Sequence, residues 1–547
     1  MADYPGREGA GVVGYKSETQ FFHDADVHEW LTALASATSI TIFAGAGLTI
    51  DRTNLGWRDL VRKVLAKQEL SEKGYIDPAG ADLVADHLAP VESATIAEHY
   101  FGMLFDDSEE GSEEGRSALM LALQGELYPG SYWRAGNLTR NVLVAAIDLA
   151  SARKDVRIVT TNYETHLEDQ YQALIDEAGG AAYDTFPRLR VQVMHDVLRH
   201  LGPTKSLAPE IELTYLHGRV PNRGDIRGDV ALSEHDYYRL RRPVTRYLRD
   251  AFRGRTVAIV GASLTDPPLL SALEDTAMTG RRLALTPMPA YGFYKKLDDD
   301  RIATLKKHLQ ARMDEFDVRL LFPDFYFQLG QFFQELRVAV LLAEDSDYAT
   351  GTPEFRYGGR LTGWWQRWAD AHLAVPRAEH RAHAAVTRGL HDVLESLSPR
   401  DGVFHSKDEP LRMEVWVRWN PSEENRCLAL WARSSEINKD PHNPTLEPLD
   451  NLSPVPAMKA FVEGRAAHIV GDGGRSFGSA QSYLAIPITH DDVPVGVVSL
   501  SSAWGKHDTR LHSRSAREMS AVIRGMRAVG RQMFGLSTLP DRQGQPG

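Results

Sequence analysis

The sequence predicts an α/β fold, in which a Rossmann-like and mainly parallel sheet carries helices on both faces, joined to a smaller α+β domain. Two observations predict the parallel sheet: short apolar segments alternate with helical segments through residues 37–343, and polar or glycine-rich turns follow these apolar segments directly. A third observation predicts the second domain. Toward the C-terminus, strand-like segments succeed one another through a short turn, as antiparallel strands do.

The first strand is expected at Ile40–Ala44, and it is followed by a glycine turn and a helix at Trp57–Lys67. The same order recurs at Val156–Val159, a β-branched run that precedes a helix at Glu164–Ala178. The expected remainder of the unit comprises strands at Ile211–Leu216, Thr256–Val260, Leu283–Thr286 and Val318–Phe322, an apolar segment at Leu269–Leu273, and an apolar-periodic helix through Phe325, Leu329, Phe332, Phe333 and Leu336.

The composition changes at Asp345–Gly363, which is rich in Gly, Thr, Tyr and Pro and lacks periodicity, so we expect a linker there. Trp364, Trp365 and Trp368 follow at nearly helical spacing, which favours a packing role over a ligand box. The remaining expected elements are a helix at His380–Leu397, strands at Met413–Trp419 and Cys427–Trp431, a hairpin of Tyr483–Ile488 and Val495–Leu500 that turns at Thr489–Pro494, and a helix at Ser513–Phe534.

Cysteine usage and charge exclude several classes of protein. Cys427 is the only cysteine among 547 residues, so an intramolecular disulfide and any site built from two thiolates of one chain are impossible. The formal net charge is −12, and residues 351–547 carry 24 Lys and Arg against 22 Asp and Glu, so the acidic excess lies in the first 350 residues. Part of it is the run Asp106–Glu114, expected as a solvated loop. An acidic body disfavours nonspecific nucleic-acid binding, and we expect no nucleic-acid partner.

Hydropathy gives no sign of a membrane segment. No stretch approaches about 18 uninterrupted apolar residues, and Met1–Lys16 contains no apolar signal region. We therefore expect a cytoplasmic protein without a membrane partner, and the lack of disulfide potential fits a reducing compartment.

Gly45-Ala46-Gly47 follows directly on the first expected strand. Glycines at such a turn let the backbone approach a pyrophosphate closely. Backbone N–H groups and a helix N-terminus then stabilise the negative charge of the pyrophosphate. Because the surroundings are acidic, positive potential here is expected to come largely from those N–H groups. The full dinucleotide fingerprint would need a third glycine where Ile50 lies, so a tight turn that serves only the fold is an equal alternative at this point.

Three more polar segments end expected strands. Thr160-Thr161-Asn162-Tyr163-Glu164 places Asn162 where it could bind a ribose or position a water, although Thr161 or Asn162 capping the next helix explains the segment equally well. His217, in Leu216-His217-Gly218, could accept a proton near neutral pH. The fourth segment is Gly261-Ala262-Ser263-Leu264-Thr265-Asp266, whose Gly and Ser could contact the far half of a nucleotide and whose Asp could cap the next helix.

Taken together in this order, the four segments resemble the sirtuin family, in particular its prokaryotic NAD-consuming branch. The resemblance covers about residues 20–343 and implies a Rossmann-like domain in which Asn162 and His217 form the catalytic pair. The residues that it implies for NAD binding are Gly45, Ala46, Gly47, Thr49, Thr161, Gly261, Ser263, Leu264 and Asp266.

This chain also departs from the family pattern. Thr49 occupies a position where sirtuins usually have Ser, and Leu55-Gly56-Trp57-Arg58-Asp59 replaces the Asp-Phe-Arg segment of the deacylases. Glu164 stands where Asp is common, and its role is left open. The four-cysteine zinc ribbon of sirtuin deacylases cannot form with one cysteine, so we expect no zinc and no other metal site. The missing ribbon favours water over a peptide amide as the acceptor.

The C-terminal part resembles a GAF domain, most clearly in Ser482-Tyr483-Leu484-Ala485-Ile486-Pro487-Ile488 and Val495-Gly496-Val497-Val498-Ser499-Leu500. GAF domains commonly sense small ligands or dimerise, and the two roles are equally compatible with these residues. The expected division is residues 20–343 for the sirtuin-like NAD-binding domain, 344–374 for a linker, 375–535 for the GAF-like sensor or dimerisation domain, and 536–547 for a tail.

The resemblances imply an NAD glycohydrolase effector that cleaves NAD to nicotinamide and ADP-ribose, gated by the GAF-like domain, and by analogy acting in prokaryotic antiviral defence through NAD depletion. The expected partners are NAD, an unidentified activating trigger that is a phage component or a small nucleotide, and further copies of the chain in a homo-oligomer. Two alternatives remain open: a protein that senses NAD or ADP-ribose without turnover, and an NAD-dependent protein deacylase or ADP-ribosyltransferase.

Overall fold

The fold was derived from a computed structural model of the chain. The residues that the structure describes are 20–105, 109–128, 136–179, 186–194, 209–224, 226, 230–290, 297–342, 356–396, 409–421, 426–438, 440, 442–449, 453–471, 480–490, 492–505, 509–511 and 516–535. The N-terminal segment 1–16, the tail 536–547 and residues 344–355 of the expected linker lie outside them.

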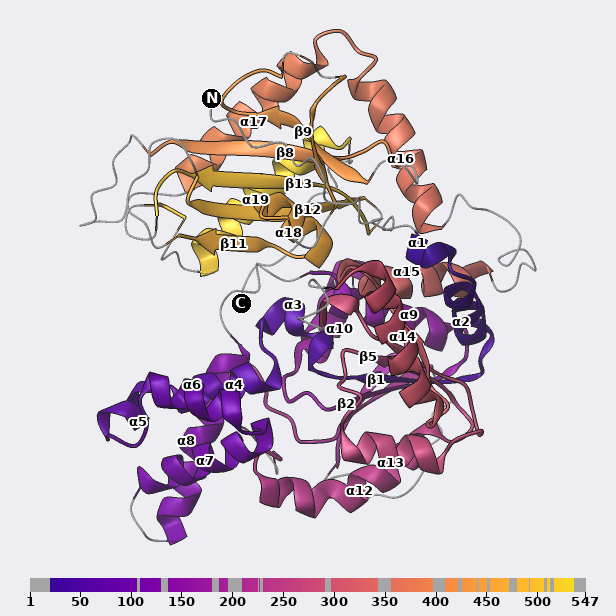
Figure 1. The fold of residues 1–547 in the computed structure, drawn as a ribbon, viewed down its shortest axis with the longest axis vertical. Helices are drawn as coiled ribbons and strands as arrows, with labels where there is room; N and C mark the ends of the chain where they lie inside the picture. Colours follow the sequence, from indigo (N-terminus) through magenta and orange to yellow (C-terminus); the bar gives the residue numbers. More distant parts are fainter. Residues whose placement is uncertain are drawn as a thin grey trace.

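The N-terminal half is built on a parallel sheet of seven described strands, in the order β3-β4-β2-β1-β5-β6-β7 (Figure 1). Every strand pair in it is parallel, with Ile40 opposite Val156 on one side of β1 and opposite Thr256 on the other. β1 therefore lies in the middle of the sheet. The strands are β1 (Ser39–Ala44), β2 (Asp155–Thr160), β3 (Arg188–Val193), β4 (Glu210–Tyr215), β5 (Thr256–Val260), β6 (Arg282–Leu285) and β7 (Arg319–Leu321).

Helices cover both faces of this sheet because successive side chains of each strand point to opposite faces. Ile40 and Ile42 of β1 join one core with α2, α9 and α15, whereas Phe43 joins a second core with α12 and α13. The covering helices are α1 (Gln20–His23), α2 (Ala25–Ser36), α9 (Leu138–Ser151), α10 (His166–Ala178) and α15 (Phe327–Leu342) with the first face, and α12 (Glu234–Phe252), α13 (Pro267–Asp275) and α14 (Asp299–Asp314) with the second.

A group of helices is inserted between β1 and α9 and has a hydrophobic core of its own, centred on Leu60, Val64, Phe101 and Leu123. Figure 1 shows this insertion at the lower left, beside the sheet. Tyr163, which follows β2, packs into the same core and so ties the insertion to the sheet. Its elements are α4 (Trp57–Leu65), α5 (Gln68–Glu72), α6 (Pro78–His87), α7 (Pro90–Met103) and α8 (Glu109–Leu127). The 3₁₀ helix Ala46–Leu48 and α3 (Ile50–Thr53) connect β1 to this insertion, and Leu48 belongs to the core of Ile40 and Ile42.

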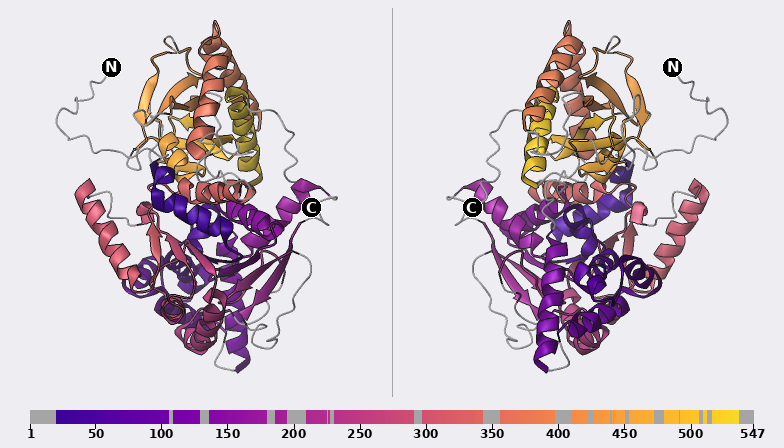
Figure 2. Two further views of the ribbon diagram at one scale, coloured as in Figure 1. Left: turned by 90° about the vertical axis from the view of Figure 1, so that its right-hand side faces the viewer. Right: turned by 90° about the vertical axis from the view of Figure 1, so that its left-hand side faces the viewer.

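The C-terminal part contains an antiparallel sheet of six described strands, in the order β10-β9-β8-β13-β12-β11. Figure 2 shows this unit stacked on the parallel-sheet unit from two sides. One continuous hydrophobic core spans both units. The elements are α16 (Tyr357–His372), α17 (Ala378–Ser396), β8 (Leu411–Trp419), β9 (Cys427–Arg433), β10 (Thr445–Pro448), α18 (Pro456–Glu463), β11 (Ala467–Val470), β12 (Ser482–His490), β13 (Val493–Ser502) and α19 (Ala516–Met533).

The predicted fold class is confirmed, since a parallel sheet flanked by helices is joined to an antiparallel unit. Three local expectations are wrong. The run Asp106–Glu114 is helical from Glu109 onward rather than a loop, α16 begins at Tyr357 inside the expected linker, and α10 begins at His166, which leaves Glu164 in the loop before it. The packing role of the tryptophans is confirmed, because the indole N–H groups of Trp364 and Trp368 donate to backbone oxygens at the end of α19.

Cys427 lies buried at the start of β9, as expected of a small hydrophobe. Within the described ranges, no helix has both the length and the apolar character needed to cross a membrane.

Candidate active site

The four motifs meet at the carboxyl ends of β1, β2, β4 and β5, which lie next to one another in the order β4-β2-β1-β5. They surround a cavity of about 330 Å³. Nine of the eleven residues expected at the site line it: Gly45, Ala46, Thr49, Thr161, Asn162, His217, Gly261, Ser263 and Asp266. Gly47 and Leu264 are not among its lining residues.

Thr49, Asn162 and Glu164 form a buried triangle of hydrogen bonds. The Thr49 hydroxyl donates to Glu164 Oε1 at 2.7 Å, and the Asn162 amide Nδ2 donates to the same oxygen at 2.8 Å and to Thr49 Oγ1 at 3.1 Å. With both amide hydrogens directed at these oxygens, the orientation of the Asn162 side chain is fixed. Its Oδ1 is buried and has no hydrogen-bond partner among the described residues.

Glu164 is the residue whose role the sequence leaves open, and the structure gives it a positioning contact. Burial raises the pKa of its carboxyl, although the hydrogen bonds from Thr49 and Asn162 oppose this shift. The alternative that Thr161 or Asn162 caps the next helix is wrong. The N-cap of α10 is Thr165, and Asn162 directs its side chain to Thr49 and Glu164 instead.

His217 lies two residues beyond β4 and is buried, with 4% of its surface exposed. Its Nδ1 has no hydrogen-bond partner within the described part of the chain. Removal from water lowers the pKa of the imidazole to about 4, so the ring is neutral at neutral pH and can accept a proton. The Tyr237 ring packs against it, with 4.8 Å between ring centroids.

The glycines are explained by how closely two turns approach. A Cβ on Gly47 would lie 2.7 Å from the Cα of Gly261, and a Cβ on Gly45 would lie 2.5 Å from the oxygen of Gly261, whose own φ is +65°. The N–H of Gly45 donates to Val260 O, and that of Gly47 donates to Gly261 O. The expectation that these N–H groups supply positive potential to a ligand is therefore wrong for Gly45 and Gly47, because the neighbouring turn uses them.

The motif after β5 divides between cavity and helix. Asp266 caps α13 as expected, accepting from the N–H of Leu269 at 3.3 Å, and burial raises the pKa of its carboxyl. The hydroxyl groups of Ser263 and Thr265 share a hydrogen bond. Leu264 lies outside the cavity, and its carbonyl accepts from Arg312 at 2.6 Å.

Four aromatic residues of the cavity lining were not predicted as site residues: Phe43 from β1, Trp57 from α4, Tyr163 and Tyr237. The hydroxyl of Tyr163 donates to Ala231 O at 2.7 Å and lies 3.3 Å from that of Tyr237. The ring centroids of Trp57 and Tyr163 are 5.4 Å apart. The sequence did contain a signal for the position of Tyr237. Ser233 and Asp236 form a capping box, which marks the start of α12 and so places Tyr237 in the first turns of a helix.

The charge of the cavity wall is neutral to acidic. Its described lining contains the carboxyls of Glu164 and Asp266 but no Lys or Arg. Such a wall suits a neutral or cationic ring and a sugar better than a diphosphate. Among the residues that the structure describes, no group of three or more His, Cys, Asp or Glu side chains could hold a metal ion, and the expected absence of zinc stays a prediction.

Comparison with known proteins supports the sirtuin-like interpretation for part of the chain. The family model of the SIR2-like domain matches residues 156–311, which include Asn162, His217 and the motif after β5. None of the curated proteins matches the chain. Among solved structures, the crystal structure of the GAF domain from Acinetobacter phosphoenolpyruvate-protein phosphotransferase is similar at 10% identity over 32% of this chain and 96% of that chain, with a TM-score of 0.19, which is too low to support an argument.

Proposed function

We propose that this protein is an NAD glycohydrolase, which cleaves NAD to nicotinamide and ADP-ribose. One observation supports this most directly: Asn162 Oδ1 and His217 Nδ1 are both buried, both lack a partner among the described residues, and belong to side chains that line the same cavity. Unpaired buried polar atoms cost about 1–3 kcal/mol each, so they favour a ligand that supplies hydrogens. The ribose hydroxyls of NAD and the attacking water are such groups.

The reaction needs little beyond positioning and one proton acceptor. The bond between the ribose C1′ and the nicotinamide nitrogen breaks, its electron pair neutralises the pyridinium, and a water oxygen bonds to C1′. Asn162 Oδ1, held by Thr49 and Glu164, orients the ribose or the water. His217 accepts the proton that the water loses and releases it to solvent.

The surroundings of His217 fit this role. Because burial lowers its pKa to about 4, the imidazole is unprotonated at neutral pH and can accept, and the same shift makes it a weak base that takes the proton only as the water bonds to C1′. The aromatic side chains of Trp57, Tyr163 and Tyr237 offer flat surfaces for a nicotinamide ring.

The deciding experiment incubates the purified protein with NAD alone and measures nicotinamide and ADP-ribose. Formation of both supports hydrolysis, NAD binding without loss supports the sensing alternative, and loss only with an added protein acceptor supports the deacylase or transferase. The assay is repeated with lysate from infected cells, so that a protein that needs its trigger is not scored as inactive.

Substitution of the catalytic pair is the first prediction. His217→Ala and Asn162→Ala should each lower NAD cleavage by about 10²-fold or more, because proton transfer and orientation are lost. Tyr238→Ala is the matched control, since Tyr238 lies on the same helix as Tyr237 but is 72% exposed. Full activity of His217→Ala with a native circular-dichroism spectrum would remove this histidine from the mechanism.

The wider role is also proposed. We expect the C-terminal unit to be a GAF-like gate, the protein to form a homo-oligomer, and NAD depletion to serve antiviral defence. Constant NAD levels in expressing cells during phage challenge would contradict that role.

A further inference from the structure

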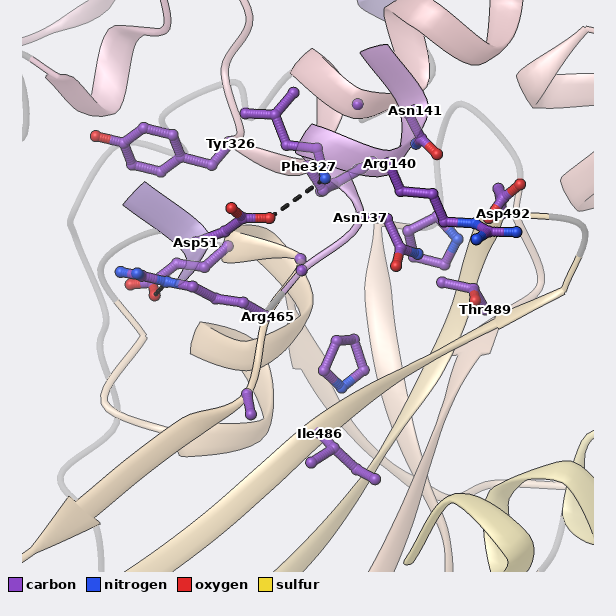
Figure 3. A pocket seen from close by; sticks show the side chains of 18 of the residues that line it. Asp51, Asn137, Arg140, Asn141, Tyr326, Phe327, Arg465, Ile486, Thr489 and Asp492 are labelled. Carbon is purple, nitrogen blue, oxygen red and sulfur yellow. Dashed lines mark hydrogen bonds and ion pairs between the residues drawn. The ribbon is translucent and has the colours of Figure 1, made fainter. Parts of the chain in front are cut away.

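A second cavity, of about 480 Å³, lies between the parallel-sheet unit and the antiparallel unit. Helices α3, α9 and α15 form one wall, and α18, β12, β13 and α19 form the other. Figure 3 shows Asp51 and Arg465 on the left of this cavity and Arg140 and Asn137 on the right. Its size falls in the range of small-molecule sites.

Positive charge predominates on the described lining of this interdomain cavity. Five arginines face three carboxyl groups, and burial raises the pKa of one of these, Asp51, which further weakens the negative side. Arg140 is paired with Glu177 at 2.8 Å, and Arg465 with Glu463 at 3.0 Å. The five arginines are Arg52, Arg140, Arg465, Arg527 and Arg531.

Two buried acceptors on the same lining are incompletely used. Asp51 Oδ2 accepts from the N–H of Leu138 at 3.3 Å, but Oδ1 has no partner among the described residues. Gln331 donates from Nε2 to Asp492 O, yet its Oε1 likewise has none. A ligand that fits this cavity therefore needs hydrogen-bond donors as well as negative charge.

We propose that the interdomain cavity binds a small phosphate ester, whose phosphate contacts the arginines and whose hydroxyl or amino groups donate to Asp51 and Gln331. Arginine is well suited to phosphate because its planar guanidinium can bind two oxygens at once. Nucleotides and sugar phosphates share the required chemistry.

The cavity is connected to the candidate active site through a short stretch of chain. Arg465, from the antiparallel unit, donates to Ile50 O at 2.9 Å and to Asn54 Oδ1 at 3.0 Å, and so holds both ends of α3. The residue before α3 is Thr49, which forms hydrogen bonds with Asn162 and Glu164 in the candidate active site. A ligand that moves Arg465 or Asp51 therefore changes the position of Thr49. The resulting effect on NAD at the candidate active site rests on the proposed function.

Binding is tested in the absence of NAD, by isothermal titration calorimetry of the full-length protein. The four ligands are adenosine 5′-monophosphate, ribose 5-phosphate, inorganic phosphate and adenosine. At least one ester should bind more tightly than both phosphate and adenosine. Tighter binding of adenosine 5′-monophosphate would identify the ligand class as nucleotides, and tighter binding of ribose 5-phosphate would identify it as sugar phosphates. Equal binding of adenosine, equal binding of inorganic phosphate, or no binding of either ester would overturn the proposal.

The location is tested with a matched pair of variants. Arg140→Gln removes a cavity cation and the Arg140–Glu177 ion pair, whereas Glu177→Gln removes only the ion pair. Arg140→Gln should weaken ester binding by about tenfold or more, the loss of one charge-assisted hydrogen bond, and Glu177→Gln should not. Equal affinities of the wild type and Arg140→Gln would place the ester elsewhere and contradict the proposal.

The connection to the active site is tested in His217→Ala, which is expected to bind NAD without consuming it. The ester affinity should differ with and without saturating NAD, and the NAD affinity should change by the same factor in the presence of the ester, because coupling is reciprocal. Identical affinities would overturn the connection. This outcome is independent of whether the wild type hydrolyses NAD.

Discussion

At the level of single residues, Glu164 is the contact that fixes Asn162. The carboxyl oxygen Oε1 accepts from both Thr49 and Asn162, and the surrounding burial favours its neutral form. A carboxyl in this position orients the amide without contacting the reacting atoms, which makes Glu164 a positioning residue in the proposed reaction.

Glu164→Gln and Glu164→Ala should therefore behave differently. Gln keeps an oxygen that can accept from Thr49 and Asn162, so activity should stay within about tenfold of the wild type. Ala leaves Asn162 with Thr49 alone, and we expect a loss of about 10²-fold in kcat with a smaller change in KM. Steady-state kinetics on NAD measure both, and a larger defect in Gln than in Ala would contradict the positioning role.

His217 also predicts a dependence of stability on pH. Its pKa is about 4 in the folded protein and about 6.5 when unfolded, so the unfolded chain binds more protons between these values. Stability should fall as pH decreases from about 6.5 to 4, by up to about 3 kcal/mol from this residue. His166, whose pKa burial lowers to about 3, acts in the same direction.

The contribution of His217 is isolated by comparing the wild type with His217→Gln in chemical denaturation at several pH values. The slope of unfolding free energy against pH should be smaller in the variant below pH 6.5. His391→Gln is the control, since His391 is 72% exposed in its side chain. Equal slopes in all three proteins would show that His217 is not held neutral by burial.

At the level of elements, the turns after β1 and β5 pack directly on each other. The N–H of Gly47 donates to Gly261 O at 2.8 Å, and no side chain separates the two backbones. These glycines consequently serve the alignment of neighbouring turns, through which Thr49 and Ser263 reach the same cavity.

Gly47→Ala tests this close approach. The added Cβ would lie 2.7 Å from the Cα of Gly261, so the turns must separate, and we expect a loss of about 1–3 kcal/mol with reduced NAD cleavage. Gly125→Ala in α8 is the control, because nothing lies within 4 Å of its added Cβ and alanine favours a helix. A stable, fully active Gly47→Ala would show that the turns tolerate separation.

At the level of the whole molecule, one hydrophobic core joins the two sheets. Phe327 of α15 and Phe461 of α18 meet edge to face with ring centroids 5.7 Å apart, and both belong to that core. A continuous core makes the two units depend on each other for stability, and it fixes the walls of the interdomain cavity.

Phe461→Ala should lower the stability of the whole protein by about 3–5 kcal/mol, because the ring is fully buried. Differential scanning calorimetry should show a single transition in the wild type, shifted downward in the variant. Leu341→Ala, at a side chain that is 68% exposed, should change stability by less than about 0.5 kcal/mol. Two separate transitions, only one of them shifted, would contradict the shared core.

The sequence by itself determined the fold class, the order of strand and turn, and nine of the residues that line the candidate active site. These features depend on local patterns, since a buried strand is a short apolar run and the polar residues that follow it must lie at its carboxyl end. The single cysteine likewise excluded a four-cysteine ribbon without any structure.

Only the tertiary structure decided what the motifs contact. Thr49 and Glu164 are separated by 115 positions and meet because β1 and β2 are neighbours in the sheet. The use of the glycine N–H groups by the adjacent turn, the arrival of Tyr237 beside His217, and the arginines between the two units follow from packing between distant elements. No local pattern carries that information, because sheet order and core packing are set by the whole chain.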